Sequence, residues 1–389
     1  MKSKSDARSA LASLPPVPTS YPPVPTSYPP VPTSYPPVPT SYPPVPTSYP
    51  PVPTSYPPVP PFSATKYQKG SRGAHFPVGH TWKMDVWSDE RSRPEAAGGI
   101  KLSVVIVARN EVSHLRRTLE CLIKGVPGDT EFIVVDDGSE DGTADSISDL
   151  KSIRLIQSSG LGVARARNLG WRESKGDMIV ISDAHMEAPE NWWEPLAATL
   201  RDSSVGMVAP AIYAIGRRKC LGYGLQLEDY SLRLRWLSKR HSAPYSVPVV
   251  STCFVAFRRE VLEKISGFDE GLDTWGHTDL ETSLRIWLFG WKVGIVPGLK
   301  VGHLFRRKHP YPVQWRSVLY NALRVAFVHF NPERLERVVE VVSSHPCFPP
   351  ELAKLVDSDC ALRRDDFARR RTHSDSWFFQ RFQPNSNIF

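Results

Sequence analysis

Residues 101–111 read KLSVVIVARNE, and this stretch indicates the fold of the region around it. The run Lys101–Ala108 is mostly aliphatic and β-branched, which is typical of a parallel strand that is buried on both faces. Three polar residues follow it, Arg109, Asn110 and Glu111. An amphipathic helix comes next, and its apolar face is formed by Val112, Leu115, Leu119 and Leu122. A buried strand that leads directly into an amphipathic helix is the unit from which α/β folds are built.

The same unit recurs along the chain. Apolar runs at 131–135, 153–156 and 178–181 predict three more strands, and residues 164–173 predict a helix before the last of them. Strands that alternate with helices predict an α/β fold with a mostly parallel central sheet. Ligands bind such sheets at the carboxyl ends of the strands. At these ends the sequence places Asn110, Asp136, Asp137 and Asp183.

The amino-terminal part of the chain has a different composition. Residues 15–56 are six copies of PPVPTSY, and proline at this density blocks helices and central strands and favours an extended polyproline II segment. We therefore expect a disordered proline-rich tail over residues 1–61. Its role stays open between a plain spacer, a set of Thr-Ser acceptors for glycosylation and a ligand for a partner with an aromatic groove. The expected organisation continues with a linker over 62–99, the α/β domain over 100–345 and a helical, basic and aromatic tail over 346–389.

Composition also bears on where the protein works. The apolar runs fall short of the roughly 18 residues that a membrane-spanning helix needs, and the run Ala10–Leu14 is short for a secretory signal. Five cysteines, an odd number without paired spacing, favour reduced thiols, so we expect a cytoplasmic protein. The net charge of +8 is compatible with a phosphorylated substrate or a peripheral contact with an anionic membrane. Because no nucleic-acid-binding motif accompanies the basic clusters, we expect no nucleic-acid partner.

A candidate metal site follows the fourth predicted strand. Asp183 and His185 are two residues apart, so in an extended segment both side chains point to one side and can hold a divalent cation. A turn with a surface histidine is the alternative interpretation. Carboxylates gathered at strand ends, such as Asp136 and Asp137, repel one another unless a cation or N–H donors lie among them. Taken by itself the Asp-x-His spacing favours the turn, and clustered carboxylates at strand ends are the reason to consider a metal.

Several segments resemble known glycosyltransferases. SVVIVARNE (103–111), FIVVDDGS (132–139) and GDMIVISDAH (176–185) resemble the nucleotide-sugar half of family-2-type glycosyltransferases with the GT-A fold. DTWGHTDLETSLRIW (273–287) and VGHLFRRKHPY (301–311) narrow the resemblance to the polypeptide N-acetylgalactosaminyltransferases. The resemblance implies the GT-A fold, which is a Rossmann-like nucleotide-sugar-binding fold.

The resemblance implies a metal site and a donor site. Asp183 and His185 correspond to ligands of the catalytic metal, with His303 as the third ligand, and manganese or another divalent cation suits this set. Asp136 and Asp137 correspond to the acids that face uracil and ribose.

Basic and aromatic residues complete the donor site that the resemblance implies. Arg165 and Arg167 are two apart on a helix and cannot both face the ligand, and of the two we expect Arg165 at the diphosphate. The segment 306–309 resembles the family's mobile segment that closes over the donor. The other expected nucleotide-sugar-binding residues are Arg109, Asn110, Glu111, Trp275 and Arg306.

The chain departs from the family at His277-Thr-Asp279, where the polypeptide transferases read Gly-Glu-Asn. Inverting family-2 enzymes carry an acidic pair whose second Asp is the general base, and Asp279 matches that position. We therefore place Asp279 and Glu281 in the expected catalytic set. The alternative is that Thr278 and Glu281 form a capping box at the start of a helix.

The expected function is that of a metal-dependent glycosyltransferase. It would move a sugar from a nucleotide sugar, UDP-linked and with UDP-N-acetylgalactosamine as a candidate, to a hydroxyl of a protein Ser/Thr or of a glycan. The three metal positions favour retention at the sugar. An inverting enzyme of polysaccharide or cell-surface glycan synthesis, with Asp279 as base, is one alternative. A non-catalytic sugar-nucleotide-binding scaffold with a proline-rich tether is the other.

Overall fold

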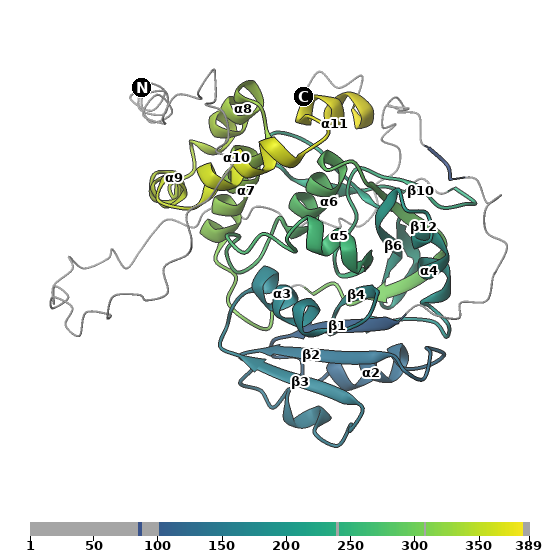
Figure 1. Cartoon of the computed structure of the whole chain (residues 1–389). Helices are drawn as coiled ribbons and strands as arrows, with labels where there is room; N and C mark the ends of the chain where they lie inside the picture. The colour runs from purple at the N-terminus through teal and green to yellow at the C-terminus, as the bar shows by residue number, and fades with distance from the viewer. Residues whose placement is uncertain (1–84, 88–100, 239–240, 307–308, 384–389) are drawn as a thin grey trace, which may run out of the picture. The chain divides into compact units, whose positions relative to one another are not determined.

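One half of the central sheet is parallel, and it contains the strands that the sequence predicts (Figure 1). The computed structural model describes residues 85–87, 101–238, 241–306 and 309–383. In this half the strands run in the order β4-β1-β2-β3, and all neighbours are parallel. The strands are β1 (Leu102–Ala108), β2 (Glu131–Asp137), β3 (Ile153–Ser158) and β4 (Met178–Asp183). The α/β fold with parallel strand–helix units is thereby confirmed.

The other half of the sheet is mixed. Beyond β4 the order continues as β11-β6-β12-β10, and β11 is antiparallel to both of its neighbours, whereas β12 is parallel to β6. Two short strands, β5 and β10, pair with β12, and β7 pairs with β6. The bounds are β5 (Met186–Glu187), β6 (Val205–Ala214), β7 (Arg217–Gly222), β10 (Tyr245–Ser246), β11 (Phe254–Arg258) and β12 (Lys292–His303). A separate two-stranded sheet joins β8 (Leu225–Leu227) to β9 (Leu234–Trp236).

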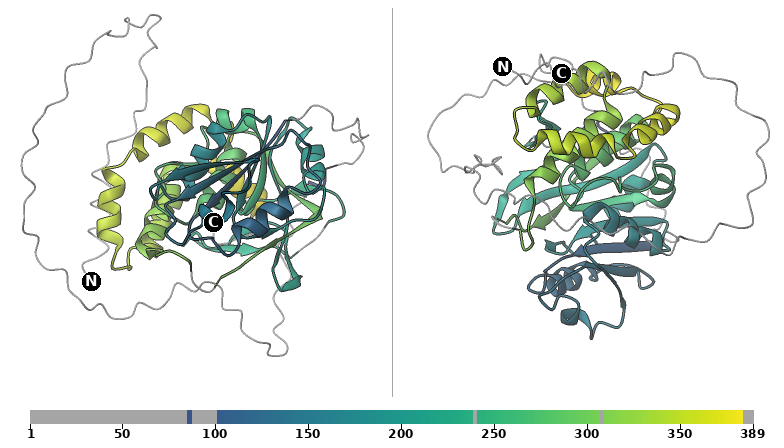
Figure 2. Two further views of the ribbon diagram at one scale, coloured as in Figure 1. Left: turned by 90° about the horizontal axis from the view of Figure 1, so that it is seen from below. Right: turned by 90° about the vertical axis from the view of Figure 1, so that its left-hand side faces the viewer.

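Helices cover both faces of this sheet (Figure 1, Figure 2). Along β1, Val104 and Ile106 pack in one core with α2 and α4, while Val105 points to the opposite face, toward α3. There Gly170 approaches so closely that an added Cβ would lie 2.2 Å from Val105, so the contact requires glycine. The helices are α2 (Leu115–Leu122), α3 (Val163–Glu173), α4 (Glu194–Leu200), α5 (Arg259–Lys264) and α6 (Thr278–Leu288), with a 3-10 turn η2 (Asp145–Ile147).

The carboxy-terminal region is helical and belongs to the same compact unit as the sheet. Helices α9 and α10 pack on α7, and α11 packs on α6. Arg324 of α7 is buried and forms ion pairs with Asp269 and with Asp359, which precedes α10. The bounds are α7 (Trp315–His329), α8 (Pro332–Val342), α9 (Phe348–Val356), α10 (Cys360–Arg370) and α11 (Asp375–Phe382). The expected tail over 346–389, as far as it is described, therefore packs on the domain.

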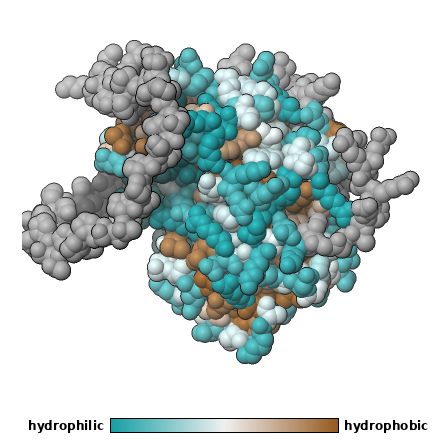
Figure 3. Space-filling view, viewed as in Figure 1, coloured by the Kyte–Doolittle hydropathy of each residue, from teal (hydrophilic) through white to brown (hydrophobic). Residues whose placement is uncertain are grey.

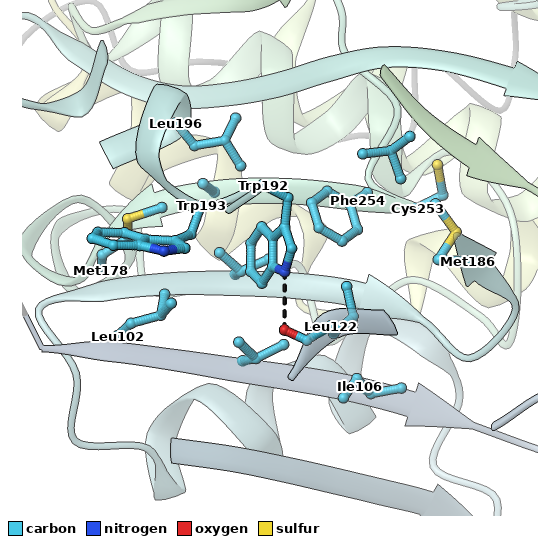
Figure 4. Packing of buried hydrophobic residues seen from close by; sticks show 14 of the residues in the cluster. Leu102, Ile106, Leu122, Met178, Met186, Trp192, Trp193, Leu196, Cys253 and Phe254 are labelled. Atoms are coloured by element: carbon cyan, nitrogen blue, oxygen red, sulfur yellow. Dashed lines mark hydrogen bonds between the residues drawn. The ribbon is translucent and has the colours of Figure 1, made fainter. Parts of the chain in front are cut away.

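Two tryptophans just before α4, Trp192 and Trp193, belong to the core (Figure 4). Trp192 and Trp193 are buried, and their ring N–H groups donate to the carbonyls of Leu122 and Gly125. Burial with a satisfied N–H is the ordinary situation of a core tryptophan. These two rings stabilise the packing of α4 against α2.

On the surface, hydrophobic residues are scattered among hydrophilic ones on the face shown in Figure 3. None of the described helices combines the length and apolar character that a bilayer crossing requires.

The four cysteines whose side chains the structure describes, Cys121, Cys253, Cys347 and Cys360, are free thiols. The tail over 1–61 and the linker over 62–99, apart from residues 85–87, lie outside the described residues.

Candidate active site

Three potential metal ligands meet at the carboxyl end of the sheet. Asp183 ends β4, His185 follows it, and His303 ends β12. Each offers one ligand atom, and these atoms all lie within 4.8 Å of one another. The backbone fixes the arrangement, because β5 pairs with β12 in the register that sets His303 opposite Met186. The chain folds here into the cluster that the resemblance implies.

The backbone around His185 is held from both sides. The buried hydroxyl of Thr118 on α2 donates to the carbonyl of Ala184 and accepts from the N–H of Met186, at 3.0 Å each. The N–H of Asp183 donates to the carbonyl of Cys253 at 2.8 Å. A ligand residue between such anchors is positioned before any ligand binds.

Asp183 is ionised by its surroundings. Burial alone would raise its pKa, but the contact with His303 and the nearby charges of Arg167 and His185 lower the pKa to about 2. The Arg167 guanidinium lies 3.2 Å from one carboxylate oxygen, and His303 Nε2 lies 3.6 Å from the other. The carboxylate therefore carries its charge at neutral pH, as a cation ligand must.

The donor set fits a divalent cation. One carboxylate and two imidazoles form the kind of mixed oxygen and nitrogen set that binds borderline divalent metals. His303 turns its Nε2 toward Asp183, 3.6 Å from a carboxylate oxygen. A cation held by Asp183 would therefore lie within reach of this imidazole.

Glu111 lies beside the cluster and contacts two of its basic neighbours. Its Oε1 lies 3.1 Å from His185 Nδ1. The guanidinium of Arg306 binds both carboxylate oxygens, at 2.7 and 2.5 Å. Burial would raise the pKa of Glu111, but the contacts with His185 and Arg306 lower it. The two residues that the resemblance places at the donor are thus paired with each other.

Asp279 connects to the same region through Thr252. Its Oδ1 accepts from the backbone N–H of Thr252 at 2.9 Å and from the Thr252 hydroxyl. Arg167 in turn donates to the Thr252 hydroxyl at 2.7 Å. Burial raises the pKa of Asp279. A chain of contacts therefore runs from Asp279 through Thr252 and Arg167 to Asp183.

The two adjacent acids that end β2 have different surroundings. Asp137 accepts from the N–H groups of Leu161 and Gly162, at 2.6 and 2.8 Å, and from Ser158 Oγ at 2.8 Å. These bonds hold the loop that begins α3. Asp136 accepts from the N–H of Ser139 through Oδ1, which leaves its second oxygen free of hydrogen bonds within the described part of the chain. Of the pair, Asp136 is the better placed to bind a ligand.

The polar residues after β1 tie three loops together. The backbone of Asn110 is left-handed (φ 56°), and its side chain donates to the Pro310 carbonyl at 3.0 Å and accepts from the N–H of Glu140 at 2.9 Å. The Arg109 guanidinium lies over the Tyr311 ring, 5.5 Å from its centroid. The side chain of Asn110 is thus committed to loop structure, whereas Arg109 covers the edge of the site.

Comparisons with known families cover most of these residues. Residues 103–266 match the family described as Glycosyl transferase family 2, and residues 233–310 match the one described as the N-terminal domain of galactosyltransferase. The chain contains a family-2 glycosyltransferase domain of the GT-A fold. Together the two matches span Asp183, His185 and His303.

Individual relatives are polypeptide N-acetylgalactosaminyltransferases. Number 11 of Xenopus tropicalis is 29% identical over 314 residues, 74% of this chain and 51% of that protein. Number 13 of Homo sapiens is 30% identical over 316 residues, 74% of this chain and 55% of that protein. The crystal structure of GalNAc-T7 with UDP, GalNAc and Mn2+ has a TM-score of 0.60 at 25% identity and covers 73% of this chain and 57% of that one. The chain spans about half the length of the curated relatives it matches.

In this glycosyltransferase domain the two arginines on α3 have the opposite of their expected roles. Arg165 is exposed and its Nε donates to the carbonyl of Glu270, whereas Arg167 is buried against Asp183 and Thr252. The rotation of α3 on the sheet decides this, because only one of two residues spaced two apart can face the sheet edge. Arg167, and not Arg165, is the arginine of the site.

Glu281 is a structural residue of the domain, and its expected catalytic role is wrong. It is fully buried, forms an ion pair with Arg285 at 2.7 Å and lies within hydrogen-bond distance, 3.1 Å, of His329 Nε2. The alternative interpretation, a capping box of Thr278 and Glu281, is not formed either, because the N-cap of α6 is His277 in left-handed backbone (φ 64°) and no side chain caps it. The hydroxyl of Thr278 instead accepts from Arg167 at 3.4 Å.

The aromatic edge of the site involves Trp275, whose ring contacts His309 with centroids 4.8 Å apart. The loop that carries Trp275 is held by Asn321 of α7, whose side-chain N–H groups donate to three carbonyls, including that of Trp275 at 3.1 Å. Sequence reasoning missed Asn321, although a buried amide in the apolar sequence of α7 was an available signal. Arg307 and Lys308, of the expected closing segment, lie outside the described residues.

Proposed function

We propose that this chain is a divalent-metal-dependent glycosyltransferase that transfers the sugar of a UDP-sugar to an acceptor hydroxyl, with retention at the sugar. The observation that carries the proposal is the cluster of Asp183, His185 and His303 at the ligand-binding edge of a family-2 glycosyltransferase domain. UDP-N-acetylgalactosamine is the first candidate donor, because the similar GalNAc-T7 structure contains UDP, GalNAc and Mn2+.

The three residues of the cluster would hold manganese or a related cation. When bound, such a cation neutralises the charge that grows on the departing diphosphate. The chain itself supplies the ionised carboxylate of Asp183 and the imidazole of His303 beside it.

Other residues around the cluster would bind the rest of the donor. The second oxygen of Asp136 can accept the uracil N–H or a ribose hydroxyl. Arg306 and Arg109 are positive and lie at the same edge, where diphosphate oxygens can accept from guanidinium groups. Trp275 and His309 form an aromatic wall that would exclude water from the reacting centre.

For the chemical step we propose attack from the face of the departing UDP. The acceptor oxygen forms a bond to the anomeric carbon while the bond from that carbon to the diphosphate oxygen breaks. The acceptor proton passes to the leaving phosphate, so no protein base is required. The commitment of Asp279 Oδ1 to Thr252 supports this route over inversion with Asp279 as base.

The acceptor is a hydroxyl of a protein Ser/Thr or of a glycan, and of the two we propose the protein hydroxyl because the relatives are polypeptide transferases. For location we propose the cytoplasm. Free thiols at the four described cysteines support a reducing compartment.

A donor screen tests the proposal. Purified protein is incubated with manganese and a panel of UDP-sugars, and release of UDP by slow water attack is measured, with Asp183→Asn as the matched control. We expect hydrolysis of one UDP-sugar by the wild type alone. Tight UDP binding in a thermal-shift assay without turnover of any sugar nucleotide would instead identify a non-catalytic scaffold.

A further inference from the structure

Glu111 is a buried carboxylate whose two oxygens are both engaged. It is 4% exposed. Its Oε1 meets His185 Nδ1 at 3.1 Å and Arg306 Nη1 at 2.7 Å, and its Oε2 meets Arg306 Nη2 at 2.5 Å. With both oxygens engaged, the carboxylate has no oxygen left to bind a hydroxyl of the nucleotide sugar. Its role in the site is therefore to position His185 and Arg306.

The backbone holds Glu111 firmly in place. Its N–H donates to the hydroxyl of Thr143 at 2.7 Å, and Thr143 is itself fully buried. Its carbonyl accepts from the N–H groups of His114 and Leu115, which begin α2. Because both backbone groups are fixed, the position of the carboxylate is set by the junction of β1 and α2.

His185 receives this carboxylate on one nitrogen of its ring. Nδ1 is buried, and Glu111 Oε1 lies 3.1 Å from it, a charge contact by distance that is not aligned as a hydrogen bond. A ring nitrogen that donates to a carboxylate leaves the other nitrogen unprotonated and turned away, as metal-binding histidines require. The other imidazole, His303, faces no carboxylate apart from Asp183 in the described structure.

We infer that Glu111 is a positioning residue of the metal site: its carboxylate orients His185 for the cation and at the same time holds Arg306 beside the cluster. The inference rests on the proposed function only in taking Asp183, His185 and His303 as the metal site. Arg306 follows His303 by three residues, so Glu111 joins the segments that leave β4 and β12. The guanidinium also balances the charge of Glu111 in its buried position.

The inference is tested by manganese affinity, which is independent of turnover. Free manganese is counted by its electron paramagnetic resonance signal during titration of the full chain. Glu111→Gln is expected to weaken binding by about 10- to 100-fold, the range for loss of such a partner. Glu111→Asp, which keeps the charge, is expected to recover part of the loss. Glu140→Gln, an exposed acid on a nearby loop, is the matched control and is expected to bind as the wild type.

A second measurement needs no variant at Glu111. Nitrogen NMR of the metal-free wild type above pH 8, with His185→Gln to assign the signal, is expected to show His185 with its proton on Nδ1. A proton on Nε2, or wild-type manganese affinity in folded Glu111→Gln, would overturn the inference.

Failure of the proposed function looks different. A wild type that binds manganese through Asp183, loses affinity in Glu111→Gln and yet turns over no sugar nucleotide refutes the transferase proposal and leaves the role of Glu111 intact. A wild type whose manganese binding is unaffected by Asp183→Asn refutes the metal site, and the inference about Glu111 with it.

Discussion

The guanidinium of Arg167 lies 3.2 Å from the carboxylate of Asp183, and this pair joins α3 to the end of β4. Arg167 also donates to the hydroxyl and the carbonyl of Thr252. The buried guanidinium of Arg167 therefore contacts the candidate metal ligand Asp183 on one side and the loop before β11 on the other.

Replacing Arg167 should weaken both the fold and the metal site. Arg167→Met leaves the hydroxyl and carbonyl of Thr252 without their donor, which should cost about 1–3 kcal/mol in the free energy of unfolding. It also removes a charge that lowers the pKa of Asp183, so manganese binding should weaken first at acidic pH. Arg165→Met, on the exposed side of the same helix, should change unfolding by less than about 0.5 kcal/mol. Urea unfolding and manganese titration of both variants check this, and equal effects would contradict it.

The two acids at the end of β2 should separate stability from binding. Asp137→Asn loses an acceptor for one of two backbone N–H groups, so unfolding should become easier by about 1–3 kcal/mol. Asp136→Asn should leave stability almost unchanged and weaken UDP binding about tenfold, equivalent to about 1.4 kcal/mol. Calorimetric titration with UDP and manganese, beside urea unfolding, measures both. Weaker UDP binding in Asp137→Asn, with lower stability in Asp136→Asn, would instead assign nucleotide binding to Asp137.

Glu281 should behave as a structural residue. Glu281→Gln leaves Arg285 buried without its anion, which should cost about 3–5 kcal/mol of stability, while UDP affinity per folded molecule stays unchanged. Calorimetric titration with UDP and manganese measures that affinity. A large fall in UDP affinity with normal stability would restore Glu281 to the catalytic set.

The surroundings of Glu281 also predict how stability depends on pH. Burial alone would raise the pKa of Glu281, but the charge of Arg285 and the hydrogen bond with His329 lower it. Its contribution to stability is therefore present above about pH 4.5, the ordinary glutamate value, and is lost as the pH falls below it. Burial also lowers the pKa of His329, so protonation below about pH 6.5 favours the unfolded chain. Both lowered pKa values therefore make the wild-type free energy of unfolding rise from acidic to neutral pH. Urea midpoints across this range should show a shallower slope in Glu281→Gln.

Several features of the fold could be predicted from sequence because they depend on local composition. The strands β1, β2 and β4 are short aliphatic runs that end in polar residues, and burial on both faces requires such runs. The direction of β11 could not be predicted in this way, because an apolar run such as Phe254–Phe257 has the same composition whether it is parallel or antiparallel. Strand direction depends on the connections that precede it, here the long segment after β6.

Site residues could be predicted from sequence where they share one short segment. They could not be predicted where tertiary packing determines which side chains meet. Asp183 and His185 share one segment, whereas His303 reaches them only through the pairing of β5 with β12. Glu281 was misassigned because α6 is buried on several sides, by α11 and the sheet, so its polar residues do not mark a solvent face. The spacing of Ala164, Arg167 and Trp171 on one helical face was a signal for the burial of Arg167.

Asp279→Asn tests the stereochemical proposal. The amide oxygen can still accept from Thr252, so stability should change by no more than about 1 kcal/mol. Under retention, turnover should fall less than tenfold, and proton NMR of the product should show a small, α-type anomeric coupling. A general base at this position would make the loss about 10² or more. That loss, together with a large β-type coupling, would establish inversion.

Metal-dependent sugar transfer at Asp183, His185 and His303 is best tested by manganese-dependent release of UDP from the UDP-sugar that the screen selects. The wild-type rate is expected to rise with free manganese to saturation and to disappear in excess chelator. His303→Gln, which removes the ligand contributed by the distant strand, is expected to be inactive while it still unfolds cooperatively. A full rate in chelator, or wild-type turnover by folded His303→Gln, would refute the metal-dependent mechanism.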